Sequence, residues 1–104
     1  APGQGLTRPE RRPVTQRGYP VVKEVVIYTT RFCPFCVRAK YLLDNKNVPY
    51  TEISVDGDRA LRAEMTAKAG RHTVPQIWIG DHHVGGCDEL MAIERSGELD
   101  QLLA

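Results

Sequence analysis

The chain has 104 residues, of which 41% are hydrophobic and 26% are charged, a balance typical of one globular domain. Fourteen Lys and Arg against thirteen Asp and Glu give a formal net charge of +1, which argues against general nucleic-acid binding because such proteins carry a large basic excess. No apolar stretch is long enough to span a bilayer and no signal-peptide core is visible, so we expect no membrane association. Three cysteines, two of them close together, favour catalytic or metal-binding cysteines in a reducing compartment over a disulfide scaffold.

Residues 1–20 differ in composition from the rest of the chain and are interpreted as a flexible arm. They contain four of the seven prolines, four arginines, a single acidic residue and no apolar periodicity. The arm has three candidate origins: a tag, the remnant of an Arg-rich organelle-targeting peptide, or a linker to another part of a longer protein. The predicted globular domain therefore spans residues 21–104.

Alternating strands and helices are predicted from Val21 onward. β-Branched or alternating segments indicate four strands, at residues 25–28, 50–55, 76–79 and 82–84. Apolar residues at helical spacing indicate a helix that begins after Cys33-Pro34 and ends at residues 45–47, and three further helices at residues 59–69, 88–95 and 98–103. The order β-α-β-α-β-β-α-α predicts one four-stranded mixed sheet flanked by helices, whose first two strands are parallel through a helical crossover.

Cys33 and Cys36 form a C-x-x-C pair where the first predicted strand ends and a helix starts. Free N–H groups and the positive end of the helix dipole favour an anion at that place, so Cys33 is predicted to be the exposed, acidic nucleophile. Cys36 lies one turn further along, where it can attack Cys33 after that sulfur has reacted, and is predicted to be the resolving thiol. Pro34 is tolerated in the first helical turn, and Arg31 adds a cation nearby in the sequence.

A zinc-binding module is the alternative interpretation of the same cysteines. Four ligands could come from Cys33, Cys36, Cys87 and either His82 or His83. Zinc knuckles usually turn back on themselves after the second cysteine, whereas this chain continues into an amphipathic helix. Thiol chemistry is therefore favoured, and no metal is expected.

Four separated motifs follow one another along the chain. They are Tyr28-Thr29-Thr30, Cys33-Pro34-Phe35-Cys36, Thr73-Val74-Pro75 and Gly85-Gly86-Cys87-Asp88. With these motifs, residues 23–104 resemble the glutaredoxins, closest to the bacterial-type dithiol class. The resemblance implies a thioredoxin-like α/β fold and a glutathione-dependent thiol–disulfide oxidoreductase with Cys33 and Cys36 as its catalytic residues.

The resemblance also implies a glutathione site beside the cysteines. The proline that matches Pro75 is cis in glutaredoxins, an arrangement that would let the backbone of Val74 pair with glutathione like an added strand. Gly86 permits close backbone approach, and the N–H groups around Cys87 and Asp88 would hold the γ-glutamyl end. The candidate binding residues are Arg31, Phe35, Arg71, Thr73, Val74, Pro75, Gly86, Cys87 and Asp88.

The sequence departs from the family pattern at Thr30, where many relatives carry a Lys for the glycyl carboxylate of glutathione. We expect Arg31 to substitute, with Arg71 opposite, although Lys and Arg differ in geometry. Trp78 stands where Phe is common and is predicted to lie in the core. The hairpin histidines, His82 and His83, are predicted to be solvated.

The implied reaction is the reduction of protein–glutathione mixed disulfides and protein disulfides, with glutathione as the reducing co-substrate. The predicted partners are glutathione, glutathionylated or disulfide-bonded proteins and, indirectly through oxidised glutathione, glutathione reductase. We expect a monomer in the cytoplasm, or inside an organelle if the arm is a targeting remnant. An alternative function is a dimeric [2Fe–2S] carrier, with Cys33 of each subunit and two glutathiones as ligands. The relatives best suited to that role carry Cys-Gly-Phe-Ser or lack the proline, so Pro34 counts against it.

Overall fold

The computed structural model describes residues 13–104 and confirms the predicted order of strands and helices. The strands are β1 (Val25–Thr29), β2 (Thr51–Ser54), β3 (Gln76–Ile79) and β4 (His82–Gly85). The helices are α2 (Pro34–Asn45), α3 (Arg59–Ala69), α4 (Cys87–Ser96) and α5 (Glu98–Leu103). The sheet has the order β2-β1-β3-β4, in which β1 is parallel to β2 and antiparallel to β3.

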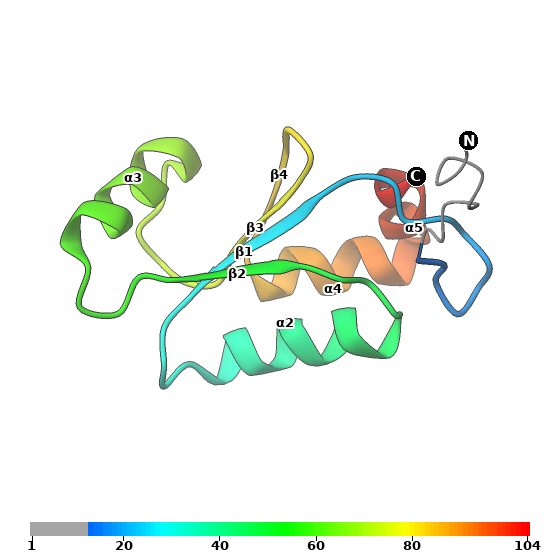
Figure 1. Cartoon of the computed structure of the whole chain (residues 1–104), viewed down its shortest axis with the longest axis horizontal. Helices are drawn as coiled ribbons and strands as arrows, with labels where there is room; N and C mark the ends of the chain where they lie inside the picture. The colour runs from blue at the N-terminus through cyan, green and yellow to red at the C-terminus, as the bar shows by residue number, and fades with distance from the viewer. Residues whose placement is uncertain (1–12) are drawn as a thin grey trace, which may run out of the picture.

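Helices cover both faces of this sheet, with α2 and α4 on one side and α3 on the other (Figure 1). Side chains along β1 pack alternately into the two layers, because successive side chains of a strand point to opposite faces of the sheet. Ile27 packs in the cluster that α2, α4 and α5 cover, while Tyr28 packs with Met65 of α3 and with Trp78. Trp78 is buried, which confirms its predicted place in the core.

Local signals fix the ends of α3 where the sequence predicts them. The Asp58 carboxylate caps the helix by accepting a hydrogen bond from the Leu61 N–H at 2.9 Å. The helix ends at Gly70, whose φ of 73° lies in the left-handed region that favours glycine.

Residues 13–20 fold back on the domain, in contrast to the flexible arm expected there. The segment is a turn in which Val14 and Pro20 form a β-bridge and the Thr15 side chain is buried. The Arg17 guanidinium lies 3.7 Å from Glu94 and 3.6 Å from Asp100. These ion pairs were missed because they join segments far apart in the sequence. Residues 1–12 of the predicted arm lie outside the described residues, and the domain boundary at residue 21 stays a prediction.

A buried ion cluster joins the end of α2 to α4 and α5. The Lys46 ammonium lies 2.9 Å from both the Glu94 and the Asp100 carboxylates. Lys46 is only 4% exposed and Asp100 only 1%. Burial by itself would lower the pKa of Lys46, but the hydrogen bonds to Asp100 and Glu94 outweigh it, so the pKa is raised and the ammonium stays charged at neutral pH.

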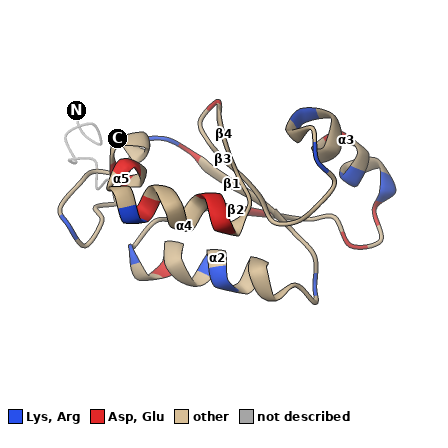
Figure 2. Ribbon diagram, turned by 180° about the vertical axis from the view of Figure 1, so that it is seen from behind, with Lys and Arg blue, Asp and Glu red and all other residues tan. Residues whose placement is uncertain are grey.

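Charges of both signs are spread over the described part of the chain. Figure 2 shows basic and acidic residues on each of α2, α3 and α4. Within residues 13–104, no helix has both the length and the apolar character needed to cross a membrane.

Candidate active site

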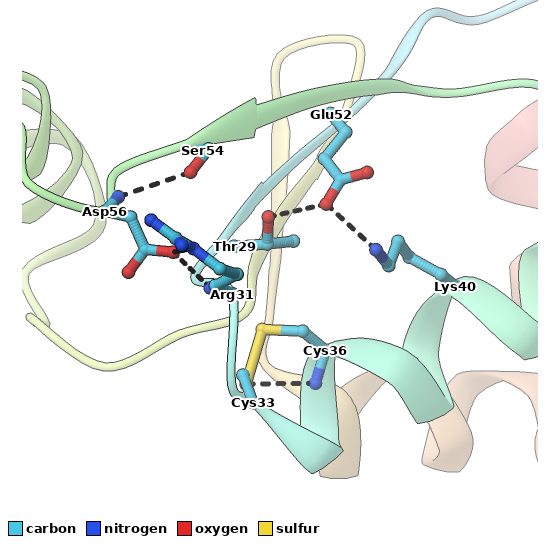
Figure 3. Close-up of polar contacts among 8 residues, drawn as sticks. All are labelled: Thr29, Arg31, Cys33, Cys36, Lys40, Glu52, Ser54 and Asp56. Carbon is cyan, nitrogen blue, oxygen red and sulfur yellow. Dashed lines mark hydrogen bonds and ion pairs between the residues drawn. A yellow bond between two sulfur atoms is a disulfide. The ribbon is translucent and has the colours of Figure 1, made fainter.

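Cys33 and Cys36 form a disulfide at the N-terminus of α2, with their Cα atoms 5.2 Å apart (Figure 3). Cys33 is the N-cap residue, and its sulfur accepts a hydrogen bond from the Cys36 N–H at 3.1 Å. The same N–H would stabilise a Cys33 thiolate once the disulfide is reduced. Cys33 is 9% exposed and Cys36 is 1% exposed, so the nucleophile predicted to be exposed is largely buried in this disulfide state, although it remains the more accessible sulfur.

A cleft of about 270 Å³ contains every predicted binding residue except Arg31. It is lined by Phe35, Arg71, Thr73, Val74, Pro75, Gly86, Cys87, Asp88 and Glu89. The Cys33 sulfur lies 3.8 Å from the Val74 carbonyl oxygen, which places the cleft directly beside the disulfide. The Val74–Pro75 peptide bond is cis, as the resemblance implied.

The start of α4 forms one wall of the cleft and includes Glu89, which sequence reasoning missed. The Gly86 N–H donates a hydrogen bond to the Glu89 carboxylate at 2.7 Å, and this bond is the main reason why the pKa of Glu89 is lowered. The Arg71 guanidinium lies 3.7 Å from the same carboxylate. Glu89 is the third residue of α4, from which a Glu side chain can reach back to the N-cap N–H; this half of a capping box is the signal that could have located the contact, since Gly86 has no side chain to form the other half.

Gly86 keeps the cleft open because it has no side chain. A Cβ atom at this position would lie 3.3 Å from the Glu89 carboxylate and 3.4 Å from the Pro75 carbonyl oxygen. Any larger residue would therefore press on both groups and displace at least one of them.

Cys87 lies in the cleft as a buried free thiol. Burial raises the pKa of Cys87, the Arg38 charge opposes this, and the neighbouring charges of Asp88 and Glu89 raise it further. Because the thiolate is the reactive form, Cys87 is a poor nucleophile at neutral pH. Asp88 is exposed in the first turn of α4, where a carboxylate interacts favourably with the helix dipole.

Arg31 lies outside this cleft, although the sequence placed it among the binding residues. Its backbone N–H donates a hydrogen bond to the Asp56 carboxylate, and its guanidinium lies 3.8 Å from the same group (Figure 3). Because β1 and β2 are parallel, the loops that follow them meet at one edge of the sheet, and Asp56 reaches Arg31 there. Arg31 lines a second, polar cleft of about 360 Å³ with Thr29, Thr30, Lys40, Glu52, Ser54 and Asp56.

His83 supports the loop that contains the cis proline, instead of being solvated as expected. The fully buried Gln76 donates hydrogen bonds to the carbonyl and hydroxyl oxygens of Thr73, and its side-chain oxygen lies 2.7 Å from His83 Nε2. The His83 ring stacks on Trp78 with centroids 4.6 Å apart. Burial, followed by the charges of Arg71 and His82, lowers the pKa of His83, so the neutral ring donates to Gln76 at neutral pH.

The zinc alternative requires four ligands that the described residues do not bring together. Within residues 13–104, no group of three or more His, Cys, Asp or Glu side chains is arranged to hold a metal ion. Cys33 and Cys36 are bonded to each other, and His83 is engaged with Gln76.

Comparisons with known proteins agree with this geometry. The family model for glutaredoxin matches residues 25–84. A glutaredoxin of Pseudomonas aeruginosa is 62% identical over 80 residues, which cover 77% of this chain and 95% of that protein. Glutaredoxin 3 of Escherichia coli is 52% identical over 79 residues, which cover 76% of this chain and 95% of that protein.

Solved structures confirm the thioredoxin-like fold that the motifs implied. The solution structure of glutaredoxin from Brucella melitensis has a TM-score of 0.72 and 50% identity, with 83% of this chain and 94% of that chain covered. The crystal structure of a buckwheat glutaredoxin–glutathione complex also has a TM-score of 0.72, with 33% identity and coverage of 78% and 76%. With its C-x-x-C disulfide at a helix N-terminus, the chain belongs to the glutaredoxin family of thiol–disulfide oxidoreductases.

Proposed function

We propose that this protein reduces protein–glutathione mixed disulfides and protein disulfides, with glutathione as its reductant, as a monomer in a reducing compartment such as the cytoplasm. The observation that carries the proposal is the cleft of about 270 Å³ beside Cys33, whose size and lining suit a tripeptide with two carboxylates and one amine. The solved complex of a buckwheat relative with glutathione supports the same ligand.

Each part of glutathione has a complementary group in this cleft. The Val74 backbone, next to the Cys33 sulfur, would pair with the cysteinyl residue as an added strand. The start of α4 would bind the γ-glutamyl carboxylate through its free N–H groups, and Asp88 would bind the amine. Arg71 would hold one of the two glutathione carboxylates, because it lines the cleft while Arg31 does not.

The reaction begins when the Cys33 thiolate attacks the glutathione sulfur of a mixed disulfide. A bond forms between Cys33 and glutathione, the protein thiolate leaves, and that thiolate takes up a proton from water. The thiolate of a second glutathione then attacks the bound glutathione sulfur, which releases oxidised glutathione and restores Cys33. For a protein disulfide, Cys36 displaces the substrate from Cys33 and leaves the disulfide seen in this structure.

A direct assay of peptide release tests the proposal. A glutathionylated peptide is mixed with the protein and glutathione, and the free peptide is measured by chromatography of acid-quenched samples, so that the readout needs no coupling enzyme. We expect turnover that saturates with the mixed disulfide and falls sharply when glutathione is replaced by cysteinylglycine, which lacks the γ-glutamyl group. Equal rates with both thiols would refute glutathione recognition by the cleft. Size-exclusion chromatography of the same protein tests the proposed monomer.

A further inference from the structure

The second cleft is lined by Lys40, which lies one helical turn after the buried resolving cysteine on α2. The Lys40 ammonium donates to a Glu52 carboxylate oxygen at 2.9 Å, and the same oxygen accepts a hydrogen bond from the Thr29 hydroxyl at 2.7 Å. Thr29 ends β1 and is 1% exposed, so this oxygen is fixed by a buried donor. The contacts tie β1, β2 and α2 together beside the disulfide, as Figure 3 shows.

Helix geometry directs Lys40 toward Cys36. The two residues are four positions apart on α2, a spacing that places their Cβ atoms about 5–6 Å apart on one face. Long helical side chains lean toward the N-terminus, which for Lys40 is the turn that contains Cys36. The Lys40 side chain is only 28% exposed, so it lies along the protein surface and does not extend into solvent.

Cys36 needs a nearby cation whenever its sulfur is charged. The residue is 1% exposed, so water cannot solvate its thiolate well, and an uncompensated buried charge is costly. A fixed ammonium one helical turn away would lower that cost.

The other charged groups near the Cys36 sulfur either pair with another residue or lie in another part of the site. Arg31 pairs with Asp56, and the Arg38 guanidinium lies 5.7 Å from the centre of the exposed Phe35 ring. On the α4 side, the titratable groups are Cys87, Asp88 and Glu89, which line the other cleft. Hydrogen bonds from Thr29 and then from Lys40 lower the pKa of Glu52, so this carboxylate stays ionised at neutral pH.

We propose that Lys40 is a positioning residue that stabilises the Cys36 thiolate, and that Glu52 both holds the ammonium in place and limits its effect. When an external thiolate attacks Cys33, the Cys33–Cys36 bond breaks, its electron pair goes to the Cys36 sulfur, and the thiolate then takes a proton from water. In the closing direction, Cys36 gives its proton to water, attacks Cys33 and displaces the substrate thiolate. The inference rests on exchange at these two cysteines and not on the identity of the reductant.

Rapid mixing of the reduced protein with a chromogenic aromatic disulfide tests this inference. One coloured thiolate is released when Cys33 attacks, and a second when Cys36 closes the disulfide, so the second phase reports on Cys36 alone. In Lys40→Met, the midpoint of the pH–rate profile for this phase should rise by about one pH unit. The closure rate at neutral pH should fall about threefold, because the smaller thiolate fraction is partly offset by a more nucleophilic sulfur.

Glu52→Gln provides the decisive comparison because it removes the negative charge and keeps a similar shape. In Glu52→Gln, the midpoint of the pH–rate profile for closure should fall and the closure rate at neutral pH should rise. Both changes are the opposite of those expected in Lys40→Met. Lys40→Arg should retain the wild-type profile. Lys23→Met, which removes an equal charge before β1 at the end of the strand away from Cys33, should also retain it.

Two outcomes would overturn the inference. If Lys40→Met and Glu52→Gln both slowed closure with unchanged midpoints, the pair would have only a structural role. If Lys23→Met matched Lys40→Met, the effect would be one of net charge. The assay contains no glutathione, so its result is separate from the test of glutathione recognition.

Discussion

Replacing Lys46 by Met is expected to destabilise the protein strongly. The substitution leaves the Glu94 and Asp100 carboxylates without the ammonium that lies 2.9 Å from each of them. Removing one partner from a buried ion pair costs about 3–5 kcal/mol, because the remaining charge is left without compensation. Arg17, half exposed and 3.6 Å from Asp100, offsets part of this loss, so we expect a decrease of about 3 kcal/mol in the free energy of unfolding.

Thermal and urea unfolding measure this loss. For a domain of this size, 1 kcal/mol corresponds to about 4–8 °C in Tm, so the Tm of Lys46→Met should fall by about 12–24 °C. The exposed-site control Lys23→Met should stay within about 0.5 kcal/mol of the wild type. Combining Lys46→Met with Glu94→Gln and Asp100→Asn should restore part of the stability, because the two uncompensated carboxylate charges are then removed. A loss below about 1 kcal/mol in Lys46→Met would refute the reasoning.

The pH dependence of the same difference gives a second measurement. The folded-state pKa of Lys46 is raised above 10.5, since its hydrogen bonds to Asp100 and Glu94 outweigh the opposing effect of burial. The ammonium therefore contributes its full stability below the unfolded-state pKa, and the contribution is lost as the pH rises through the folded-state pKa. The stability gap between wild type and Lys46→Met should be constant near neutral pH and should shrink above about pH 10.5.

Three further predictions concern the active site. Cys33→Ser should abolish all thiol exchange. Cys36→Ser should retain reduction of a glutathione mixed disulfide but lose most reduction of protein disulfides. Steady-state assays with both substrates measure this, and they would show the reverse pattern if the two cysteines had exchanged roles. Arg71→Ala should raise the KM for glutathione several-fold and weaken its salt dependence, while Arg31→Ala should leave KM near the wild-type value because its side chain lies outside the cleft. A larger KM effect for Arg31→Ala would reverse that assignment. Cys87→Ser should keep most activity, because burial holds the Cys87 thiol protonated; complete inactivation would point to a mechanism with three cysteines.

Local sequence signals predict much of the fold because they act within a few residues. The Asp58 cap, the Gly70 stop and the alternation in β1 each specify their element without reference to the rest of the chain. The buried cluster of Lys46 and Asp100 has no such signal, because each residue alone is typical of a surface. Only the packing of α2 against α4 and α5 brings the two charges together.

The candidate site likewise contains residues that the sequence predicted and residues that it misplaced or missed. The motif around the cis proline and the start of α4 line one cleft, and the proline is cis as the family resemblance implied. Arg31 was expected there because it follows Thr30, the position at which many relatives carry a Lys, but Asp56 in the loop after β2 pairs with it instead. Glu89 was missed because its part in the site depends on the distance between α4 and Arg71, which composition and spacing do not encode.

The stack of His83 on Trp78 gives the protein an internal optical probe. Trp78 is the chain's single tryptophan, so its fluorescence comes from one known position. A protonated imidazole in contact with an indole quenches its emission, and burial lowers the pKa of His83, so quenching should begin only at a pH below the usual histidine range. Because Gln76 links this ring to Thr73, the same signal should respond when a ligand occupies the neighbouring cleft. Binding can then be followed in the unlabelled protein without any chemistry at the cysteines.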